Sequence, residues 1–303
     1  MISIEKALLM DRRMRALTGL DGPAFLQLEK RFALVLAQEL APQTRAGQPR
    51  RRAAGAGPKG ALPGPRRKLF FMLFYLKAYP TQDVMGWLFG LSQPQVCARV
   101  AQLLPLLQTL MHAELPARHG RQLDEIMATL PEVNEVLLID GTERPIARPQ
   151  HRGRRDRHYS GRRKRCTIKN VVVTAKGRVV LLTPTAPGRR HDKKEADAAR
   201  VRLAGGVRVL GDSGFQGYQA GAAVVSTPHK KPRGRPLHWR HRRANRELAR
   251  ERVPVEHTLA SVKRWSILRQ PLRARRKATA DQVMLIGCAL HNYRLEQKAA
   301  EQN

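Results

Sequence analysis

A run of four β-forming residues that ends on an acid is the feature that most constrains this fold. Residues 136–139 read VLLI, and Asp140 and Gly141 follow them directly. An apolar run without polar alternation predicts a strand that is buried on both faces of a sheet. Asp140 then stands at the exposed strand end, either in an ordinary turn or as a carboxylate available for metal or phosphate chemistry. A second acid in the same setting favours the chemical interpretation.

Such a second acid follows residues 207–210, where the β-rich run VRVL precedes Gly211 and Asp212. Between the two runs, the sequence predicts a strand pair over Cys166–Pro184 and then a loop and a polar helix. This order predicts an α/β fold with a mixed sheet: its first strands are antiparallel, and the next strand arrives through a helical crossover. If the strands of Asp140 and Asp212 are parallel neighbours, both acids emerge at the same edge, although the sequence leaves the strand order open.

The charge balance points to a polyanionic partner. The 303 residues include 57 Lys or Arg against 24 Asp or Glu, which gives a formal net charge of +33. Nucleic acid is the first expected partner, because each neutralised phosphate releases counterions, and an anionic membrane surface is the second. No apolar run approaches the roughly 18 residues that span a bilayer, and the N-terminus lacks a signal-peptide pattern. A cytoplasmic location without membrane association is therefore expected.

The N-terminal part predicts helices that bind DNA. Apolar residues recur with helical spacing before residue 40, and a stretch rich in Pro, Gly and Arg then predicts a flexible basic linker. After it come a helix ending at Pro80, a short helix capped by Thr81, and a third helix capped by Ser92. This all-α pattern predicts a helix-turn-helix, or alternatively a generic bundle. In the helix-turn-helix reading, the third helix presents to the major groove the side chains of Gln93, Gln95 and Arg99.

The expected domain boundaries follow from these changes in composition. They comprise N-terminal helices (1–40), a basic flexible linker (41–67), a helix-turn-helix domain (68–112), a connector (113–134) and an α/β domain (135–297).

Two basic runs lie within the α/β part. Residues 151–165 lead directly into a strand and are expected to form a loop whose Arg162, Arg163, Lys164 and Arg165 contact DNA phosphates. Residues 229–243 hold seven Lys or Arg and no acid. His238 and His241 in this second run have no partner ligands nearby in sequence, so a zinc site is not expected. The three cysteines are far apart and lack zinc or disulfide spacing.

A third acid is expected on the helix predicted for residues 244–268. At about 100° per residue, Arg252 and Lys263 fall on nearly the same helix face as Glu256. Carboxylates at a strand edge and a facing helix suit two hard divalent ions, and neighbouring cations suit the flanking phosphates. The alternative interpretation is an ordinary pattern of salt bridges along the helix.

Four sequence blocks in this order resemble DDE transposases of bacterial insertion sequences, in the group named after insertion sequence five. The blocks are IDGTERP, SGRRKRCTIKN, GDSGFQG and VEHTLASVKRW. The resemblance implies an RNase H-like catalytic domain flanked by helices and a metal-binding, catalytic triad of Asp140, Asp212 and Glu256. It also places Arg252 and Lys263 in a helix signature. That signature has a tyrosine where this chain has Ala249, and many relatives have a histidine where this chain has Cys166.

The resemblance further implies Mg²⁺ or Mn²⁺, with two ions in each active site, and double-stranded DNA as the partner, as terminal inverted repeats and as target. A homodimer or larger synaptic assembly is expected as well. The expected activity is strand cleavage followed by 3′-OH strand transfer. The alternatives are a non-catalytic DNA-binding protein or repressor derived from a transposase, and a nuclease of the RNase H type.

Two other acids are rival metal ligands. Asp192 precedes a predicted helix and is expected to act as its cap. Glu143 is expected to pair with the basic loop of residues 151–165.

Overall fold

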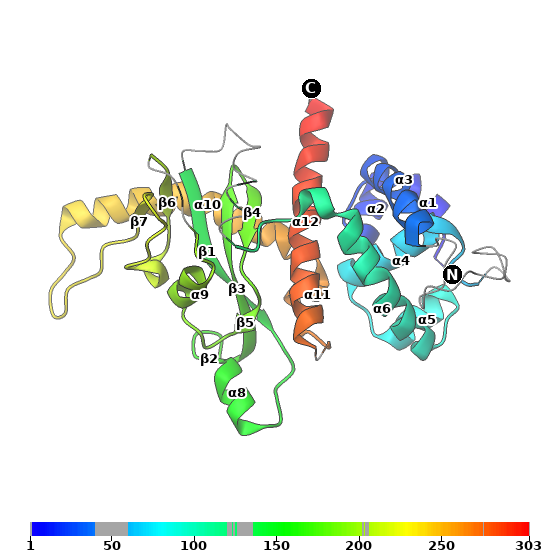
Figure 1. Cartoon of the computed structure of the whole chain (residues 1–303), viewed down its shortest axis with the longest axis horizontal. Coiled ribbons are helices and arrows are strands. Elements are labelled where there is room, and N and C mark those ends of the chain that lie inside the picture. Colours follow the sequence, from blue (N-terminus) through cyan, green and yellow to red (C-terminus); the bar gives the residue numbers. More distant parts are fainter. Residues whose placement is uncertain are drawn as a thin grey trace. The chain divides into compact units, whose positions relative to one another are not determined.

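The computed structural model describes residues 2–39, 60–119, 123, 125, 136–201, 203, 206–274 and 276–302 (Figure 1). The chain forms two compact units. Unit 1 comprises Met1–Ala113, Arg264–Ile267 and Glu296–Asn303, and unit 2 comprises Glu114–Lys263 and Leu268–Leu295. Among the described residues, no helix combines the length and the apolar character that crossing a membrane requires.

Unit 1 is helical, as the N-terminal sequence predicts. Phe70 lies at its centre and packs against the rings of Phe25, Phe74 and Phe89, with centroids 6.2–6.3 Å apart. These rings are buried, and such contacts join helices that are separated in sequence. The helices are α1 (Ile4–Leu8), α2 (Asp11–Thr18), α3 (Gly22–Glu39), α4 (Gly64–Ala78), α5 (Gln82–Phe89) and α6 (Gln93–Leu110).

The turn between α5 and α6 has the capping chemistry that the sequence predicts. Thr81 Oγ1 accepts a hydrogen bond from Val84 N at the start of α5. At the start of α6, Ser92 and Gln95 form a capping box. Gly86 permits the tight turn, since a Cβ there would lie 2.3 Å from the Leu91 carbonyl oxygen. These caps confirm the predicted starts of both helices.

Two domain boundaries expected from sequence differ from the observed helices. Helix α4 begins at Gly64, four residues inside the predicted linker, because Pro65 fits the first turn of a helix. The final helix, α12, spans Lys277–Gln302 and continues past the predicted end at residue 297. Residues 40–59, which make up most of the predicted linker, lie outside the described residues, as does much of the 113–134 connector.

Unit 2 contains a mixed sheet with the strand order β2-β3-β1-β6-β7, and β4 and β5 also pair with β3 (Figure 1). Strand β1 pairs antiparallel with β3 and parallel with β6. The strands are β1 (Val136–Pro145), β2 (Tyr159–Ser160), β3 (Arg165–Ala175), β4 (Arg178–Leu182), β5 (Ala186–Pro187), β6 (Arg208–Leu210) and β7 (Val224–Ser226). The α/β fold class, with helices flanking a mixed sheet, is confirmed.

Helices cover both faces of this sheet. On one face, Leu137 and Ile139 of β1 belong to a buried cluster with Ala196 of α9 (Asp192–Ala198) and Phe215 of the short helix η3 (Ser213–Phe215). On the other face, Leu138 packs with Leu210 and with Val255 of α10 (Trp239–Val262). Consecutive β1 residues therefore enter opposite cores, which explains the unbroken apolar run of residues 136–139.

Three elements of unit 2 differ from the sequence predictions. Strand β1 does not end at Asp140 but runs to Pro145, because β3 pairs with it along this whole length. The basic run 151–165 is not a loop throughout, since it contains α8 (Arg152–His158) and β2. Helix α10 begins at Trp239, where His238 Nδ1 accepts a hydrogen bond from Arg240 N, and not at residue 244. The predicted end of that helix is a separate short helix, α11 (Ser266–Arg269).

Candidate active site

The parallel pairing of β1 and β6 brings two predicted acids to the same edge of the sheet. Leu138 lies opposite Leu210, the last residue of β6. Asp140 and Asp212 each follow two residues after this pair, and the electrostatic interaction between them raises the pKa of Asp140. The order of the strands, which the sequence left open, thus satisfies the condition for a shared carboxylate site.

Asp140 is a partly buried carboxylate with one close cation. Its Oδ1 lies 3.5 Å from Arg252 of α10, and the two side chains are 20% and 12% exposed. Burial raises the pKa of Asp140 to about 6, and the negative charges of Asp212 and Asp192 add to this effect, whereas Arg252 opposes it. The desolvation of Asp140 therefore outweighs the attraction of Arg252.

Asp212 is held by the turn that follows β6. Its Oδ1 accepts a hydrogen bond from Gly214 N at 2.8 Å, and it caps the helix η3. This bond fixes the carboxylate relative to the end of β6 and leaves its second oxygen outside the cap interaction. The Gly-rich turn seen in the sequence after Asp212 is therefore the device that orients this acid.

Asp192 lies closer to this site than its predicted role as a helix cap suggested. The cap of α9 is His191, and Asp192 is the first residue of the helix. Its Oδ1 accepts a hydrogen bond from Lys169 Nζ at 2.8 Å, and Lys169 also lies 3.7 Å from Glu143. The carboxylate of Asp192 touches Gly141, where a Cβ would lie 2.6 Å from Oδ1. Gly141 is thus a strand residue without room for a side chain, and not part of a turn.

Replacing Gly141 by Ala is expected to destabilise unit 2 through a clash with the Asp192 carboxylate. The added methyl group must push the Asp192 carboxylate away from β1 by several tenths of an ångström, or move β1 itself. We expect the free energy of unfolding to fall by about 1–3 kcal/mol. Urea unfolding measures the effect. The double variant Gly141→Ala, Asp192→Ala should recover most of the lost stability; no recovery would contradict the steric explanation.

Helix α10 carries the third predicted acid along the same edge. Arg252 contacts Asp140, and Lys263 Nζ donates a hydrogen bond to the Glu143 carbonyl oxygen at 3.2 Å. Glu256 lies between these two contacts along the helix and is exposed to solvent. Within the described residues, no three His, Cys, Asp or Glu side chains are close enough to form a metal site. The structure thus brings together Asp140 and Asp212, while Glu256 stands on the adjacent helix without joining them.

Several of the predicted phosphate-binding cations surround one pocket in unit 2. Arg162, Arg163, Arg165 and Lys263 line a pocket of about 410 Å³, and Arg269 joins them. Glu143 and Thr167 also line it, and Thr167 Oγ1 donates a hydrogen bond to Glu143 Oε2 at 2.8 Å. Burial lowers the pKa of Lys263, and the charge of Arg163 lowers it further. Glu143 was expected to pair with the basic loop, but its side chain contacts Lys169 and Thr167 instead.

The remaining predicted DNA contacts are exposed. Gln93, Gln95 and Arg99 of α6 all lie on the surface of unit 1. Each side chain also has a local partner: Gln93 bonds to Gln82, Gln95 Oε1 accepts from Ser92 N, and Arg99 donates to Gln102. In the protein without DNA, the side chain of Gln95 therefore forms part of the helix cap. Lys164 is exposed in a turn, with a φ of 52°.

Comparisons with known proteins agree with this arrangement of acids and helices. Residues 139–292 match the family model described as "DDE superfamily endonuclease", and residues 60–112 match "Helix-turn-helix of DDE superfamily endonuclease". The chain belongs to the DDE superfamily endonucleases. It is also 29% identical over 244 residues to the "Probable transposase for insertion sequence element IS702" of Microchaete diplosiphon, a match that covers 78% of this chain and 85% of that relative. No solved structure matches it.

The family assignment confirms the resemblance carried by the four sequence blocks. The matched helix-turn-helix covers α4, α5 and α6, so the predicted DNA-binding architecture of this DDE superfamily endonuclease is confirmed as well. Membership of the group named after insertion sequence five stays a prediction. Members of this superfamily generally use divalent metal ions, and oxygen-rich acids such as Asp140 and Asp212 are the ligands that Mg²⁺ prefers. The raised pKa of Asp140 fits a site that is completed by added positive charge.

The charge of Asp140 should make the endonuclease less stable as pH rises from about 4 to about 6. The folded-state pKa of about 6 lies above the ordinary value of 3.8, so the folded protein binds this proton more tightly than the unfolded chain. Its contribution to stability is therefore present at low pH and lost as pH passes through 6. The unfolding free energy of Asp140→Asn minus that of wild type should therefore increase by about 2–3 kcal/mol from pH 4 to pH 7.5. Urea unfolding with a metal chelator measures this; a difference independent of pH would contradict it.

Proposed function

We propose that this endonuclease is a DNA transposase that binds the ends of its own element and performs metal-dependent strand cleavage and 3′-OH strand transfer. The observation that carries the proposal is the parallel pairing of β1 and β6, which sets Asp140 and Asp212 side by side. The helix-turn-helix match and the similarity to the probable IS702 transposase support it.

Asp140, Asp212 and Glu256 are the residues that would hold the metal ions, two in each active site, with Mg²⁺ or Mn²⁺ as the expected ion. When bound, such ions activate the attacking oxygen and stabilise the leaving 3′ oxygen of a phosphodiester. The carboxylate oxygens of the three acids suit a hard cation. Glu256 must approach Asp140 and Asp212 for all three acids to bind the same ions. The exposed position of Glu256 on α10, one turn after Arg252, leaves its side chain free of contacts that would prevent this movement.

The protein's own cations position the DNA in this mechanism. Arg162, Arg163 and Arg165 bind backbone phosphates at the pocket next to β1, and Lys263 joins them from the end of α10. Arg252 keeps Asp140 oriented toward the same edge of the sheet. Gln93, Gln95 and Arg99 of α6 are proposed to meet the major groove of the terminal repeats. The +33 net charge offsets the repulsion between these acids and a polyanion.

Two reactions follow from this arrangement. In the first, a water oxygen attacks the phosphorus atom, the P–O3′ bond breaks, and the element end keeps a free 3′ hydroxyl group. In the second, that hydroxyl oxygen attacks a target phosphodiester and displaces its 3′ oxygen, so the number of phosphodiester bonds is conserved. Neither reaction requires a covalent bond between the enzyme and DNA. Handling two ends together is proposed to involve a homodimer or larger assembly.

A cleavage assay on DNA that carries the terminal repeats of the element tests the proposal. We expect nicking at the repeat boundary with Mg²⁺ or Mn²⁺, none with a chelator, and joining of the new 3′ end to a second DNA. Binding of the repeats without cleavage in either metal would instead support the alternative of a DNA-binding repressor. Preferential cleavage of RNA in an RNA–DNA hybrid would support a nuclease of the RNase H type.

A further inference from the structure

A basic arm extends from unit 2, and the proposed mechanism does not use it. The arm comprises residues 229–246, the loop after β7 and the first two turns of α10, and it extends from the sheet beyond β7 (Figure 1). It contains no Asp or Glu. It contains eight Lys or Arg: Lys230, Lys231, Arg233, Arg235, Arg240, Arg242, Arg243 and Arg246.

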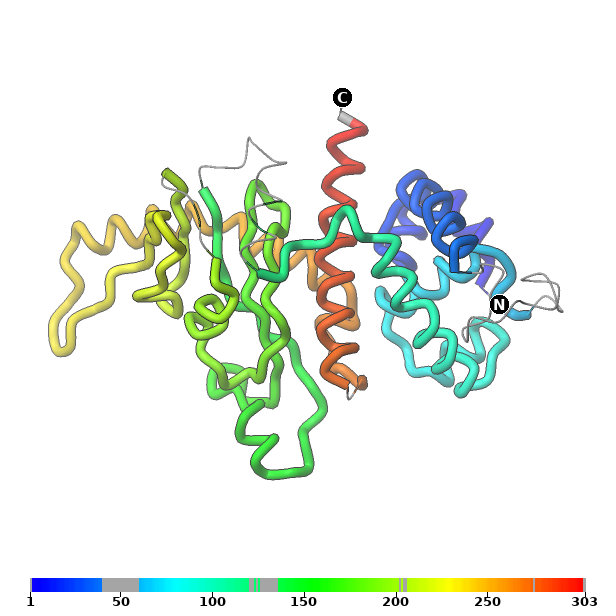
Figure 2. Tube along the Cα trace, viewed as in Figure 1, coloured from blue at the N-terminus to red at the C-terminus, as the bar shows by residue number. Residues whose placement is uncertain are grey.

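Specific contacts fold the arm back on itself. The trace leaves β7 and turns back into α10 (Figure 2). Asn245 of α10 holds the start of the loop, because its Oδ1 accepts from His229 N at 2.8 Å and its Nδ2 donates to His229 O at 3.0 Å. The His229 ring also stacks on His241, with centroids 4.1 Å apart and an interplanar angle of 14°. The loop and the helix therefore present their cations on one structured element.

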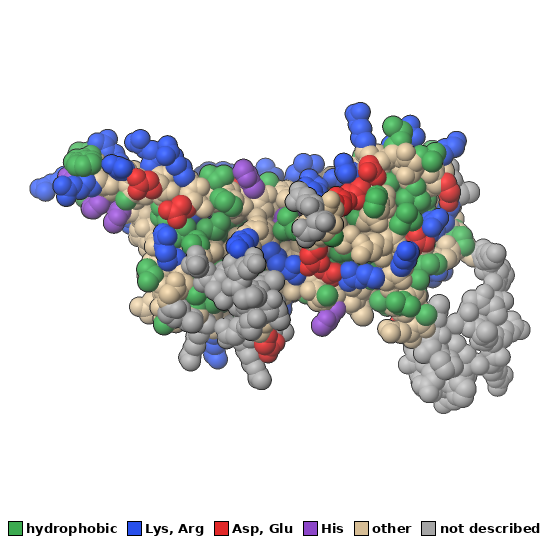
Figure 3. All heavy atoms as spheres, turned by 90° about the horizontal axis from the view of Figure 1, so that it is seen from above, with side chains coloured by type: hydrophobic (Ala, Val, Ile, Leu, Met, Phe, Trp, Pro, Cys, Tyr) green, Lys and Arg blue, Asp and Glu red, His purple; other side chains and the backbone are tan. Residues whose placement is uncertain are grey.

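The positive charge of the arm is largely uncompensated. Every side chain from Lys230 to Arg243 is exposed except that of Leu237, which is half-buried. Among the described residues, the ion pairs of this arm are limited to Arg243 with Glu247, and both of those side chains are largely exposed. Lys and Arg side chains gather at this end of unit 2, with histidines among them (Figure 3). Concentrating like charges destabilises a folded protein, so this grouping favours a polyanionic partner.

An exposed indole lies among these cations. Trp239, the first residue of α10, is 56% exposed, and the Arg240 guanidinium lies 5.4 Å from the centre of its ring. His238 precedes Trp239 in the sequence, and the centroids of these two rings lie 5.8 Å apart. An aromatic ring flanked by cations offers a surface on which a nucleobase can stack while its phosphates contact Lys and Arg.

Other occupants fit the arm less well. Stable binding to a membrane surface takes an apolar helix face or a lipid chain beside a basic patch, and the large apolar side chains of the arm are Trp239 and the half-buried Leu237. A second copy of the chain offers few complementary charges, since 24 acids stand against 57 Lys or Arg in the whole sequence. A DNA strand supplies both the regular negative charge and the accessible base.

We propose that the arm is a second DNA-binding surface, on which Lys230, Lys231, Arg233 and Arg235 contact successive phosphates and Trp239 stacks on an unpaired base. The inference rests on the proposed function insofar as DNA is the substrate of this enzyme. It adds a surface outside the carboxylate site and the helix-turn-helix, and it favours a strand whose bases are unpaired over an intact duplex.

Salt dependence tests the phosphate contacts. One variant replaces Lys230, Lys231, Arg233 and Arg235 by Gln, and a matched control replaces Lys6, Arg12, Arg13 and Lys30, which are exposed cations of unit 1. Binding of single-stranded DNA is measured with a chelator present, so that no cleavage is needed. We expect the slope of log affinity against log salt to fall by about 2–3 in the arm variant, at about 0.7 for each contact. Equal slopes in the arm variant and the control would overturn the proposal.

Base stacking is tested at Trp239. Trp239→Ala should weaken binding of single-stranded DNA by about 10- to 100-fold and binding of blunt duplex by less than about threefold, and Trp239→Phe should recover most of the loss. Photocrosslinking with 5-iododeoxyuridine should join the base to the peptide that contains Trp239. Equal losses on both DNAs, crosslinks elsewhere, or preference for RNA of the same sequence would overturn the inference. Because these assays measure binding, a protein that binds through the arm without cleaving DNA would contradict the proposed function alone.

Discussion

Replacing Asp140 or Asp212 by Asn is expected to lower strand cleavage by at least about a thousandfold, while affinity for the terminal repeats changes by less than about threefold. Each change removes one charged ligand from the proposed metal site, and metal ions contribute several kcal/mol of transition-state stabilisation. Both carboxylates lie at the same edge of the sheet, and Arg252 pairs with Asp140. The helix-turn-helix and the basic residues are unchanged, so binding should remain.

Calorimetric titration with Mg²⁺ or Mn²⁺ measures ion binding in addition to the cleavage rate. Wild-type protein bound to DNA should take up two ions in each active site, and either variant should lose at least one of them. Asp156→Asn is the matched control, because Asp156 is an exposed acid of α8, and we expect it to cleave at the wild-type rate. A cleavage rate within tenfold of wild type in Asp140→Asn or Asp212→Asn would remove these residues from the metal site.

Glu256→Gln should give the same loss if Glu256 completes the metal site. Because its side chain is exposed in the described structure, its participation requires a movement of the side chain when metal and DNA bind. Normal cleavage by Glu256→Gln, together with loss in Asp192→Asn, would instead assign the third position to Asp192. Asp192 already touches Gly141, directly after Asp140.

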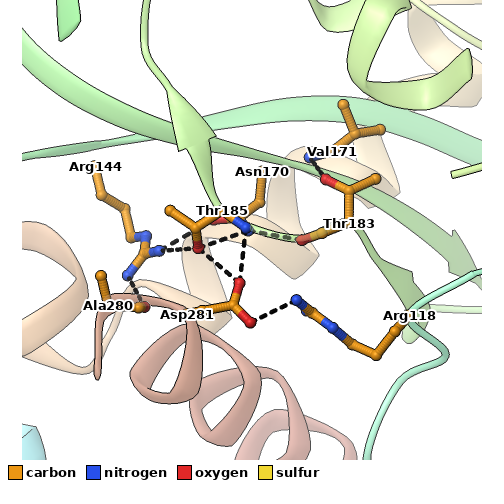
Figure 4. Close-up of polar contacts among 8 residues, drawn as sticks. All are labelled: Arg118, Arg144, Asn170, Val171, Thr183, Thr185, Ala280 and Asp281. Carbon is orange, nitrogen blue, oxygen red and sulfur yellow. Dashed lines mark hydrogen bonds and ion pairs between the residues drawn. The ribbon is translucent and has the colours of Figure 1, made fainter. Parts of the chain in front are cut away.

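Arg144→Met is expected to lower the free energy of unfolding by about 3–5 kcal/mol, the largest effect on stability that we predict. Arg144 is 1% exposed and lies on β1, four residues after Asp140. Its guanidinium donates to Ala280 O of α12 at 3.0 Å, to Asn170 Oδ1 at 3.1 Å and to Thr185 Oγ1 at 3.3 Å (Figure 4). Burial lowers its pKa to about 10, so it remains charged at neutral pH. Methionine fills a similar volume but donates none of these bonds.

The same network continues to the start of α12. Asp281 accepts hydrogen bonds from Thr185 N and Oγ1 through Oδ1, and its Oδ2 pairs with Arg118 at 2.6 Å (Figure 4). These hydrogen bonds and the charge of Arg118 outweigh burial and hold the pKa of Asp281 below its ordinary value. The network therefore anchors the strand that carries Asp140 to a helix more than 130 residues later.

Urea unfolding measures the free energy lost in Arg144→Met. Arg148→Met is the matched control, because Arg148 is exposed shortly after the end of β1 and its replacement should change stability by less than about 0.5 kcal/mol. An Arg144→Met protein with wild-type stability would show that the hydrogen bonds of Arg144 offset its desolvation without net gain. A loss of cleavage greater than the loss of folded protein would show that the network also positions Asp140.

Local sequence signals were sufficient for most elements of unit 1. Ser92 with Gln95 predicts where α6 begins, because the capping box lies within four residues of the chain. Helix α4 was predicted four residues short, since Pro65 in its first turn resembled a continuation of the Pro-rich linker. In unit 2, the start of α10 was missed for a similar reason, because Arg is common both in exposed helices and in basic loops.

The sequence by itself was sufficient for the family, through the resemblance of four blocks, and for the α/β fold class, because apolar strand runs and Gly-rich turns are local properties. The tertiary structure decided which acids meet. Strand order depends on pairing between residues that are distant in the chain, and it placed β6 parallel to β1, as the two acids require. The tertiary structure also decided that β1 continues past Asp140, that Asp192 packs on Gly141, and that Arg144 is buried. Those contacts join residues far apart in the sequence, so no local pattern could reveal them.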